Sequence, residues 1–199
     1  MGDPGQVSPP DQSGHRSVPI DRTCATSHLR QTMVTIHGTC VLLSEIGVLL
    51  RGESGRGKSD LALRLIDGGA QLVSDDRVAL RAGSGRLTAS APPALAGLLE
   101  VRGVGILPVP SVASADVGLV VDLLPRDGVE RLPQAETEML MGIALPRLGL
   151  HAFDASTPAK IRLAAACLRD GRLERVPASL TVQSGSVQSG QSHPSPVAP

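Results

Sequence analysis

Short apolar runs alternate with turn-forming residues through the middle of the chain, from about residue 33 to residue 171. Short runs rich in Val, Ile and Leu are typical of β-strands, and the Gly, Asp, Ser and Pro residues between them are typical of turns. Two other segments repeat apolar residues at helical spacing. The pattern predicts an α/β fold with a mixed sheet, more strands than helices, and strands over residues 34–36, 40–44, 48–51, 71–74, 78–82, 86–90, 116–124 and 145–152.

The two predicted helices have recognisable ends. The first follows residue 59, with Leu61 and Leu65 on one face and Gly68 as a stop signal. The second should take Thr157 as its N-cap and run to Arg169. Both helices have an apolar face, and we expect that of the second helix to contact the core or another subunit.

The two ends of the chain lack the alternating pattern. Residues 1–32 are rich in Pro, Gly, Ser, Asp and Gln, and residues 182–199 are dominated by Ser, Gln, Gly and Pro. Such segments bury too little apolar surface to fold. We therefore expect a disordered N-terminal tail, a catalytic domain over residues 33–181 and a disordered C-terminal tail. Met33 lies where order should begin, and we expect it to be the natural first residue, which N-terminal sequencing would test.

Composition narrows the classes of function. The chain has 199 residues with 19 basic and 19 acidic side chains, so its formal net charge is zero. This balance excludes the basic field with which proteins hold nucleic acid. No apolar run reaches the roughly 20 residues that cross a bilayer, and the N-terminal segment lacks the apolar stretch of a secretory signal. We expect a cytoplasmic protein without nucleic-acid or membrane partners. Phe153 is the only aromatic residue, so extended stacking platforms are essentially absent.

The strongest motif is a glycine-rich loop between a predicted strand and a predicted helix. Residues 52–59 fit the P-loop pattern G-x-x-x-x-G-K-[ST] at every fixed position. Glycines let backbone N–H groups curl around an anion, and the following helix N-terminus adds partial positive charge. Lys58 can then reach the β- and γ-phosphates of a nucleotide, and the Ser59 hydroxyl can bind Mg²⁺. The predicted phosphate-binding residues are Gly52, Glu53, Ser54, Gly55, Arg56, Gly57, Lys58 and Ser59.

Two adjacent carboxylates, Asp75 and Asp76, follow the next predicted strand. The segment from Lys58 to Asp76 has the length of a helix, a turn and a strand, which should return a parallel strand beside the P-loop strand. Both carboxylates would then lie at the carboxyl end of the sheet, near the nucleotide. One could help to hold Mg²⁺ and the other could accept the proton of an attacking hydroxyl. The structural alternative is a solvated turn.

Three further residues are candidates for the same site. His37 precedes the P-loop by two predicted strands and could return beside the phosphates. Glu100 offers an oxygen ligand for Mg²⁺, and Arg102 offers a guanidinium that could neutralise phosphoryl charge. Each also has a plain alternative, namely a structural histidine or a surface strand with a bulge.

Taken together and in this order, four strings resemble the HPr kinase/phosphorylase family: TIHGTCVLL, GVLLRGESGRGKSDLALRLI, LVSDDRV and LLEVRGVGIL. The resemblance covers about residues 33–170, which correspond to the catalytic domain of that family. It implies a P-loop domain similar to the nucleotide-binding core of phosphoenolpyruvate carboxykinase, usually assembled as a homo-hexamer. It also implies ATP-dependent phosphorylation of a serine in HPr, the small phosphocarrier protein of the sugar phosphotransferase system.

The resemblance further implies roles for individual residues. Lys58 would contact the ATP phosphates, and Ser59 and Glu100 would bind Mg²⁺. Asp76 would be the base for the seryl hydroxyl, and the acid in the reverse direction. His37 matches an active-site histidine of the family.

Two arginines and one departure complete the comparison with the family. Arg102 lies in a segment that the family uses in both of its activities, and Arg131 loosely matches a family arginine. Longer members use an arginine-rich loop for dephosphorylation where this chain has residues 151–160, in which Lys160 is the only Lys or Arg. Three functions therefore stay open: an HPr kinase with or without phosphorolysis, a P-loop kinase of small molecules, and a non-catalytic ATP sensor.

Overall fold

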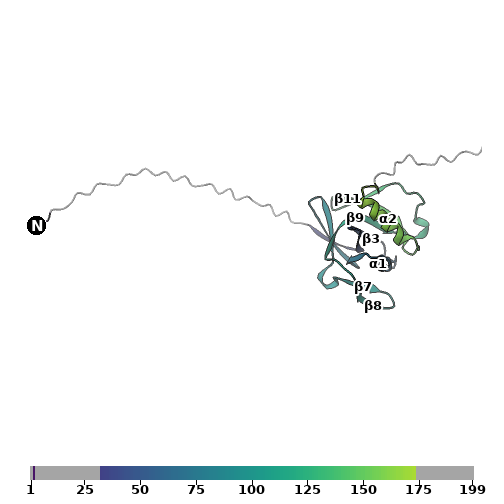
Figure 1. Cartoon of the computed structure of the whole chain (residues 1–199), viewed down its shortest axis with the longest axis horizontal. Helices are drawn as coiled ribbons and strands as arrows, with labels where there is room; N and C mark the ends of the chain where they lie inside the picture. The colour runs from purple at the N-terminus through teal and green to yellow at the C-terminus, as the bar shows by residue number, and fades with distance from the viewer. Residues whose placement is uncertain (1, 3–31, 174–199) are drawn as a thin grey trace, which may run out of the picture. The chain divides into compact units, whose positions relative to one another are not determined.

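The computed structural model describes Gly2 and residues 32–173, which form a mixed α/β domain (Figure 1). The predicted tails, apart from Gly2 and residue 32, lie outside the described residues, as do residues 174–181 of the predicted domain. The strands are β1 (Met33–His37), β2 (Thr39–Leu43), β3 (Ile46–Arg51), β4 (Gln71–Ser74), β5 (Arg77–Gly83), β6 (Arg86–Ser90), β7 (Leu98–Val101), β8 (Gly105–Pro108), β9 (Ser114–Leu123), β10 (Glu136–Leu140) and β11 (Ile143–Leu150). The helices are α1 (Lys58–Asp67), α2 (Thr157–Arg169) and the 3₁₀ helices η1 (Pro93–Leu95) and η2 (Arg126–Gly128).

The predicted fold class is confirmed, because nine strands form one mixed sheet. Its order is β1-β5-β6-β9-β3-β2-β4, and β11 pairs with both β9 and β10. β9 runs parallel to β3 and to β11, whereas the other pairs in this sheet are antiparallel. β9 is long enough, at 10 residues, to pair with three strands.

Three tight turns connect neighbouring strands of this sheet. They lie at residues 44–45, 84–85 and 141–142, and both residues of each turn have positive φ. Two positive φ angles in a two-residue loop are typical of the type I′ turn, whose twist matches that of the flanking strands. The turn at residues 44–45 therefore folds β2 back along β3.

This turn corrects one prediction about the strand that precedes the acidic pair. β4 pairs with β2, not with the P-loop strand β3, because β2 already occupies that edge of β3. β2 is antiparallel to both strands, so β4 and β3 still run in the same direction. The predicted direction is confirmed and the predicted direct pairing is wrong. Asp75, directly after β4, therefore lies at the same edge of the sheet as the start of the P-loop, directly after β3.

The P-loop strand is buried on both faces. Val48 and Leu50 belong to one core cluster, which includes Leu61 of α1 and Ile161 of α2. The alternate residue, Leu49, belongs to a second cluster with apolar side chains of β5, β6 and β9. Alternation along a strand sends successive side chains to opposite faces, so β3 holds the start of the P-loop between two cores.

Both α-helices lie close to where the sequence predicts them. α1 ends at Asp67 with Gly68 as its C-cap. α2 begins at Thr157, so its N-cap is Ser156, one residue earlier than predicted. The Thr157 hydroxyl instead donates a hydrogen bond to the carbonyl of His151 at 2.6 Å. Neither α-helix in residues 32–173 is long and apolar enough to cross a bilayer.

A separate two-stranded sheet is formed by β7 and β8 (Figure 1), and β7 contacts β4. The segment after β8 runs along β4, because the Leu72 N–H donates to Pro110 O at 2.8 Å and the Val112 N–H donates to Leu72 O at 2.9 Å. The list of predicted strands lacks β7, β8 and β10, although the surface-strand alternative for Glu100 agrees with β7. These contacts bring Glu100 of β7 next to Asp75.

Candidate active site

The P-loop leaves β3 at Arg51 and turns into α1 through backbone that favours glycine. Gly52, Gly55 and Gly57 have φ angles of 149°, 79° and 86°, a region that other residues adopt only with strain. Gly57 is the N-cap of α1 and contributes no capping side chain. The first N–H groups of a helix have no partner within the helix and attract anions. The loop therefore has the backbone geometry of a phosphate cradle.

Lys58 lies across this loop. Its Nζ donates hydrogen bonds to the carbonyls of Gly52 at 2.8 Å and Glu53 at 2.9 Å, and the residue is 7% exposed. Burial lowers the pKa of Lys58, although Asp75 and Asp76 act in the opposite direction. The amine is therefore held at the loop by backbone oxygens, where a bound phosphate oxygen could replace one of them.

Asp75 is the buried acid of the pair and is 6% exposed. Its carboxylate accepts hydrogen bonds from the Thr39 hydroxyl at 2.7 Å and from the Ser59 hydroxyl at 3.0 Å. The Glu100 N–H approaches the same carboxylate at 3.5 Å. Asp75 thus joins β2, α1 and β7 around the hydroxyl that the P-loop motif assigns to Mg²⁺.

Asp76 is the exposed acid and faces His37. The Nδ1 atom of His37 lies 3.2 Å from Asp76 Oδ1 and 3.1 Å from the Asp76 carbonyl oxygen. Asp76 has a φ of 62°, and the Arg77 N–H donates to Asp75 O at 2.7 Å, which closes a three-residue turn around it. Such turns with positive φ are rare and strained, and strain of this kind gathers at functional sites. The turn directs adjacent carboxylates to different surroundings.

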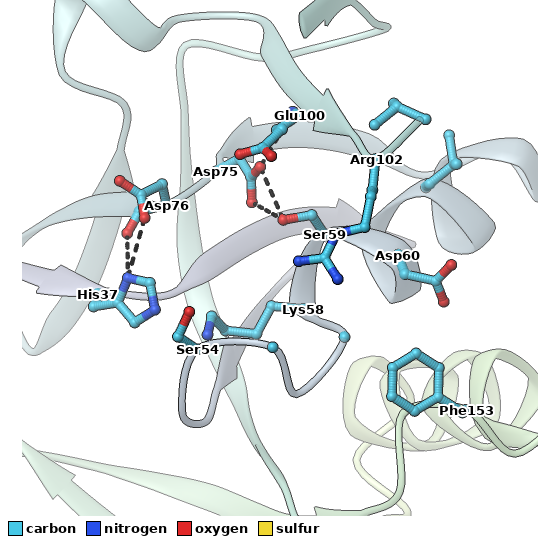
Figure 2. Close-up of a pocket in the computed structure, with 14 residues that line it drawn as sticks. His37, Ser54, Lys58, Ser59, Asp60, Asp75, Asp76, Glu100, Arg102 and Phe153 are labelled. Carbon is cyan, nitrogen blue, oxygen red and sulfur yellow. Dashed lines mark hydrogen bonds and ion pairs between the residues drawn. The ribbon is translucent and has the colours of Figure 1, made fainter. Parts of the chain in front are cut away.

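These side chains line one cleft with a volume of about 370 Å³. Figure 2 shows Asp75 and Glu100 above Ser59, Asp76 with His37 at one end, and Asp60 with Phe153 at the other. The full lining is His37, Ser54, Gly55, Gly57, Lys58, Ser59, Asp60, Leu63, Asp75, Asp76, Glu100, Val101, Arg102 and Phe153.

The oxygen donors around Ser59 fit a Mg²⁺ ion that also binds phosphate. The Ser59 hydroxyl and the Asp75 and Glu100 carboxylates are the hard ligands that this ion prefers. No group of three His, Cys, Asp or Glu side chains within residues 32–173 is placed to hold a metal by itself. Mg²⁺ commonly takes few protein ligands and completes its octahedron with substrate phosphates and water.

The structure brings most, but not all, of the predicted site residues together. The cleft lining includes His37, Lys58, Ser59, Asp76, Glu100 and Arg102. Gly52 and Glu53 contribute carbonyls to Lys58, while the Glu53 side chain accepts two hydrogen bonds from Arg56 at 3.1 and 2.8 Å. Arg131 is exposed in the loop between η2 and β10 and is not among the residues that line the cleft.

The prediction misses two residues that shape this site. Thr39 is fully buried, and its hydroxyl donates to Asp75; its place next to His37-Gly38 was the only signal available. Phe153 lines the cleft although it lies far along the chain from the P-loop. Its signal was composition, because it is the only aromatic residue in the chain.

Comparison with known proteins identifies a family. A family model described as "HPr Serine kinase C-terminal domain" matches residues 29–167. The chain is 37% identical over 147 residues to the HPr kinase/phosphorylase of Cupriavidus necator, covering 65% of this chain and 45% of that protein. It is 49% identical over 77 residues to the HPr kinase/phosphorylase of Clostridium tetani, covering 39% of this chain and 25% of that protein.

One solved structure extends the likeness to three dimensions. It is the Hpr(Ser) kinase/phosphatase from Coxiella burnetii, with a TM-score of 0.62 and 30% sequence identity, covering 71% of this chain and 97% of that chain. The chain spans less than half the length of the two curated relatives described above.

Proposed function

The chain belongs to the HPr serine kinase C-terminal domain family, and from that premise we propose that it is an ATP-dependent protein serine kinase. Its proposed acceptor is a serine of an HPr-like phosphocarrier protein. We further propose that it works in the cytoplasm as a homo-oligomer, a hexamer by resemblance, which light scattering of the purified protein would test.

One observation carries this proposal: the two adjacent aspartates have different surroundings in the same cleft. Asp75 is buried and accepts the Ser59 hydroxyl, whereas Asp76 is exposed beside His37. The first arrangement suits support of a cation and the second suits a base that must meet an incoming hydroxyl. A pure binding module has no need for the second group.

We assign the donor half of the site to the P-loop and α1. The backbone N–H groups of residues 52–59 and the N-terminus of α1 would hold the phosphates of ATP. Lys58 would exchange a loop carbonyl for a phosphate oxygen, because its amine already lies at the loop. Ser59, with Asp75 and Glu100, would hold Mg²⁺, which when bound offsets the charge of the β- and γ-phosphates.

We assign the acceptor half to Asp76. The seryl oxygen would form a bond to the γ-phosphorus while the bond from that phosphorus to the ADP oxygen breaks, and Asp76 would take the seryl proton. His37, 3.2 Å from Asp76 Oδ1, would orient that carboxylate. Arg102 lines the cleft and would neutralise charge on the transferred group. In phosphorolysis Asp76 would return the proton to the seryl oxygen.

The deciding experiment mixes the protein with Mg²⁺-ATP and HPr and follows the intact mass of HPr. We expect HPr to gain one phosphoryl group. Asp76→Asn should lower the rate about 10²- to 10⁴-fold, because general-base catalysis contributes that much, while ATP still binds. Asp127→Asn, at an exposed aspartate of η2 outside the cleft lining, is the matched control.

Other outcomes separate the competing functions. Unchanged transfer by Asp76→Asn would reject Asp76 as the base. Transfer to a metabolite but not to HPr would favour a small-molecule kinase, and ATP binding without transfer to any acceptor would favour a sensor. Adding inorganic phosphate to phosphorylated HPr then tests phosphorolysis.

A further inference from the structure

Phe153 is an exposed apolar side chain inside an otherwise polar cleft. It is the only aromatic residue of the chain and is 56% exposed. It lines the cleft together with Leu63 of α1, at the end where Asp60 lies and away from His37 and Asp76 (Figure 2). A large apolar group left open in a ligand cleft indicates contact with an apolar part of the ligand.

Hydrogen bonds hold the segment that carries Phe153. Arg64 of α1 donates to the carbonyls of Ala152 and Asp154, the latter at 3.5 Å. Arg126 donates to the Asp154 carboxylate at 3.0 and 2.5 Å. The residues on both sides of Phe153 are thus tied to α1 and to η2, so the backbone that presents the ring is fixed before any ligand binds.

The ring itself is also held in place, and from the side of the P-loop. A Cβ atom added to Gly57 would lie 2.8 Å from Cζ of Phe153, so the ring rests against this glycine. His151 packs against it at 5.7 Å between ring centroids and 67° between planes. A ring fixed in this way loses little side-chain freedom when a flat ligand stacks on it.

The orientation of the proposed nucleotide follows from the two ends of the cleft. The phosphates belong at Lys58 and Ser59, and the acceptor hydroxyl must approach at Asp76. The nucleoside must therefore extend toward the opposite end, where Leu63 and Phe153 provide apolar surface.

We propose that Phe153 is the stacking surface for the base of the bound nucleotide. This assignment rests on the proposed function for the presence of a nucleotide in the cleft and for its orientation relative to Asp76. A phenyl ring reads no hydrogen-bond pattern, so it stabilises any purine by its face. The P-loop would then bind the phosphates and Phe153 would bind the base.

Calorimetric titration with two ligands tests the proposal. In the presence of Mg²⁺, Phe153→Ala should weaken ATP binding roughly 5- to 150-fold, the range expected for one base stacked on an aromatic ring. Binding of inorganic tripolyphosphate, which has no base, should stay unchanged. Leu132→Ala, an 82% exposed apolar residue outside the cleft lining, is the control and should change neither affinity.

A second variant reports on the same contact by a different signal. The chain contains no Trp and no Tyr, so Phe153→Trp introduces a single fluorophore at the proposed contact. ATP should quench its emission and tripolyphosphate should not. This measurement remains decisive if Phe153→Ala fails to fold.

Three results would overturn the assignment. The first is an unchanged ATP affinity in Phe153→Ala, and the second is an emission of Phe153→Trp that does not respond to ATP. The third is an equal weakening of ATP and tripolyphosphate binding in Phe153→Ala, which would mean that Phe153 only supports the P-loop through Gly57. Failure of the proposed function has a different signature: HPr would gain no phosphoryl group from Mg²⁺-ATP, whatever the ATP affinity of Phe153→Ala.

Discussion

Two groups of charged side chains lie near the end of β3, and they differ in where their hydrogen bonds go. The strand-face cluster comprises Arg51, Asp122, Glu136, Glu138 and Arg147. Arg51 donates to both oxygens of Asp122 at 2.8 and 3.0 Å and to Glu138 at 2.8 Å. Arg147 donates to Asp122 at 2.5 Å and to Glu136 at 2.8 Å. Each charge in this cluster meets an opposite charge of the protein.

The cleft is built in the opposite way. Three of its four carboxylates, Asp75, Asp76 and Glu100, face few cations, because the Lys58 amine bonds to backbone oxygens. The fourth, Asp60, pairs with Arg64 of the same helix at 3.0 Å. None of the ion pairs formed within residues 32–173 includes Glu100 or Arg102. Charges that are satisfied within the protein hold strands together, whereas charges left around a cavity are available to a ligand. The first cluster should therefore control stability and the second activity.

The largest effect on phosphoryl transfer should come from removing the Lys58 amine from the cleft. Lys58→Ala should lower phosphoryl transfer to HPr by about 10³-fold or more, because a positioned cation stabilises charge that develops on the transferred group. The melting temperature should change little, since water can replace Lys58 at the loop carbonyls. Lys160→Ala is the control, because Lys160 is the only other lysine in the chain and is exposed on α2. Normal turnover of Lys58→Ala would refute the phosphate cradle.

Substitution of Asp75 should have a smaller effect on transfer and should also lower stability, because Asp75 lines the cleft but is buried and hydrogen-bonded within the protein. Asp75→Ala should lower transfer about 10²-fold by freeing Ser59. It should also lower the free energy of unfolding by about 1–2 kcal/mol, because the buried Thr39 hydroxyl loses its acceptor. Transfer assays and urea unfolding measure the two quantities.

Asp116→Ala is the matched control for this variant. Asp116 also accepts a threonine hydroxyl, that of Thr88 at 3.0 Å, but in an exposed position outside the cleft lining. It should change stability by less than about 1 kcal/mol and leave transfer unchanged. If Asp75→Ala loses stability but keeps full activity, Asp75 serves stability and not catalysis, as the strand-face cluster does.

The sequence predicts contiguous features well, because their geometry is local. The strand, loop and helix around residues 48–67 follow one another along the chain, so the glycines of the loop and the stop at Gly68 could be assigned from spacing alone. The neighbour of β4 could not, since strand pairing depends on the turn at residues 44–45, which places β2 between β3 and β4. Strand β8 is exposed along its length and carries no alternating signal.

The sequence also predicts the candidate site only as far as local motifs determine it. The order of motifs predicted that Lys58, Ser59, Asp76 and Glu100 would meet, and they line one cleft. Adjacent aspartates have the same chemistry in a sequence, so their roles could be distinguished only by burial, which depends on Thr39 and on the hairpin β7–β8. The ring of Phe153 reaches the P-loop through tertiary packing that no local pattern encodes.

A substitution in the strand-face cluster should lower stability and leave phosphoryl transfer nearly unchanged, which is the reverse of the result expected for Lys58 in the cleft. Asp122→Ala leaves Arg51 and Arg147 without their shared acceptor and should lower the free energy of unfolding by about 2 kcal/mol, less than for a fully buried pair. Transfer should stay within a few-fold of the parent. Chemical denaturation measures the loss, with Asp127→Ala as the exposed control. A large loss of activity at unchanged stability would break the division between the two clusters.

The smallest expected effect is the change with pH of the stabilisation that Asp122 provides. Burial opposes ionisation of Asp122, but hydrogen bonds from Arg51 and Arg147 outweigh it and hold the pKa of this carboxyl below its usual value. A lowered folded-state pKa means that the stabilisation is complete above the unfolded pKa of about 3.9 and is lost as the pH falls through the folded value.

Asp122→Asn should therefore be less stable than the parent at pH 6, and the gap in free energy of unfolding should narrow by about 1 kcal/mol near pH 3. Urea midpoints at several pH values measure this gap, with Asp127→Asn, at an exposed aspartate of η2, as the control. A gap that stays constant from pH 6 to pH 3 would mean that Asp122 acts by packing and not by charge.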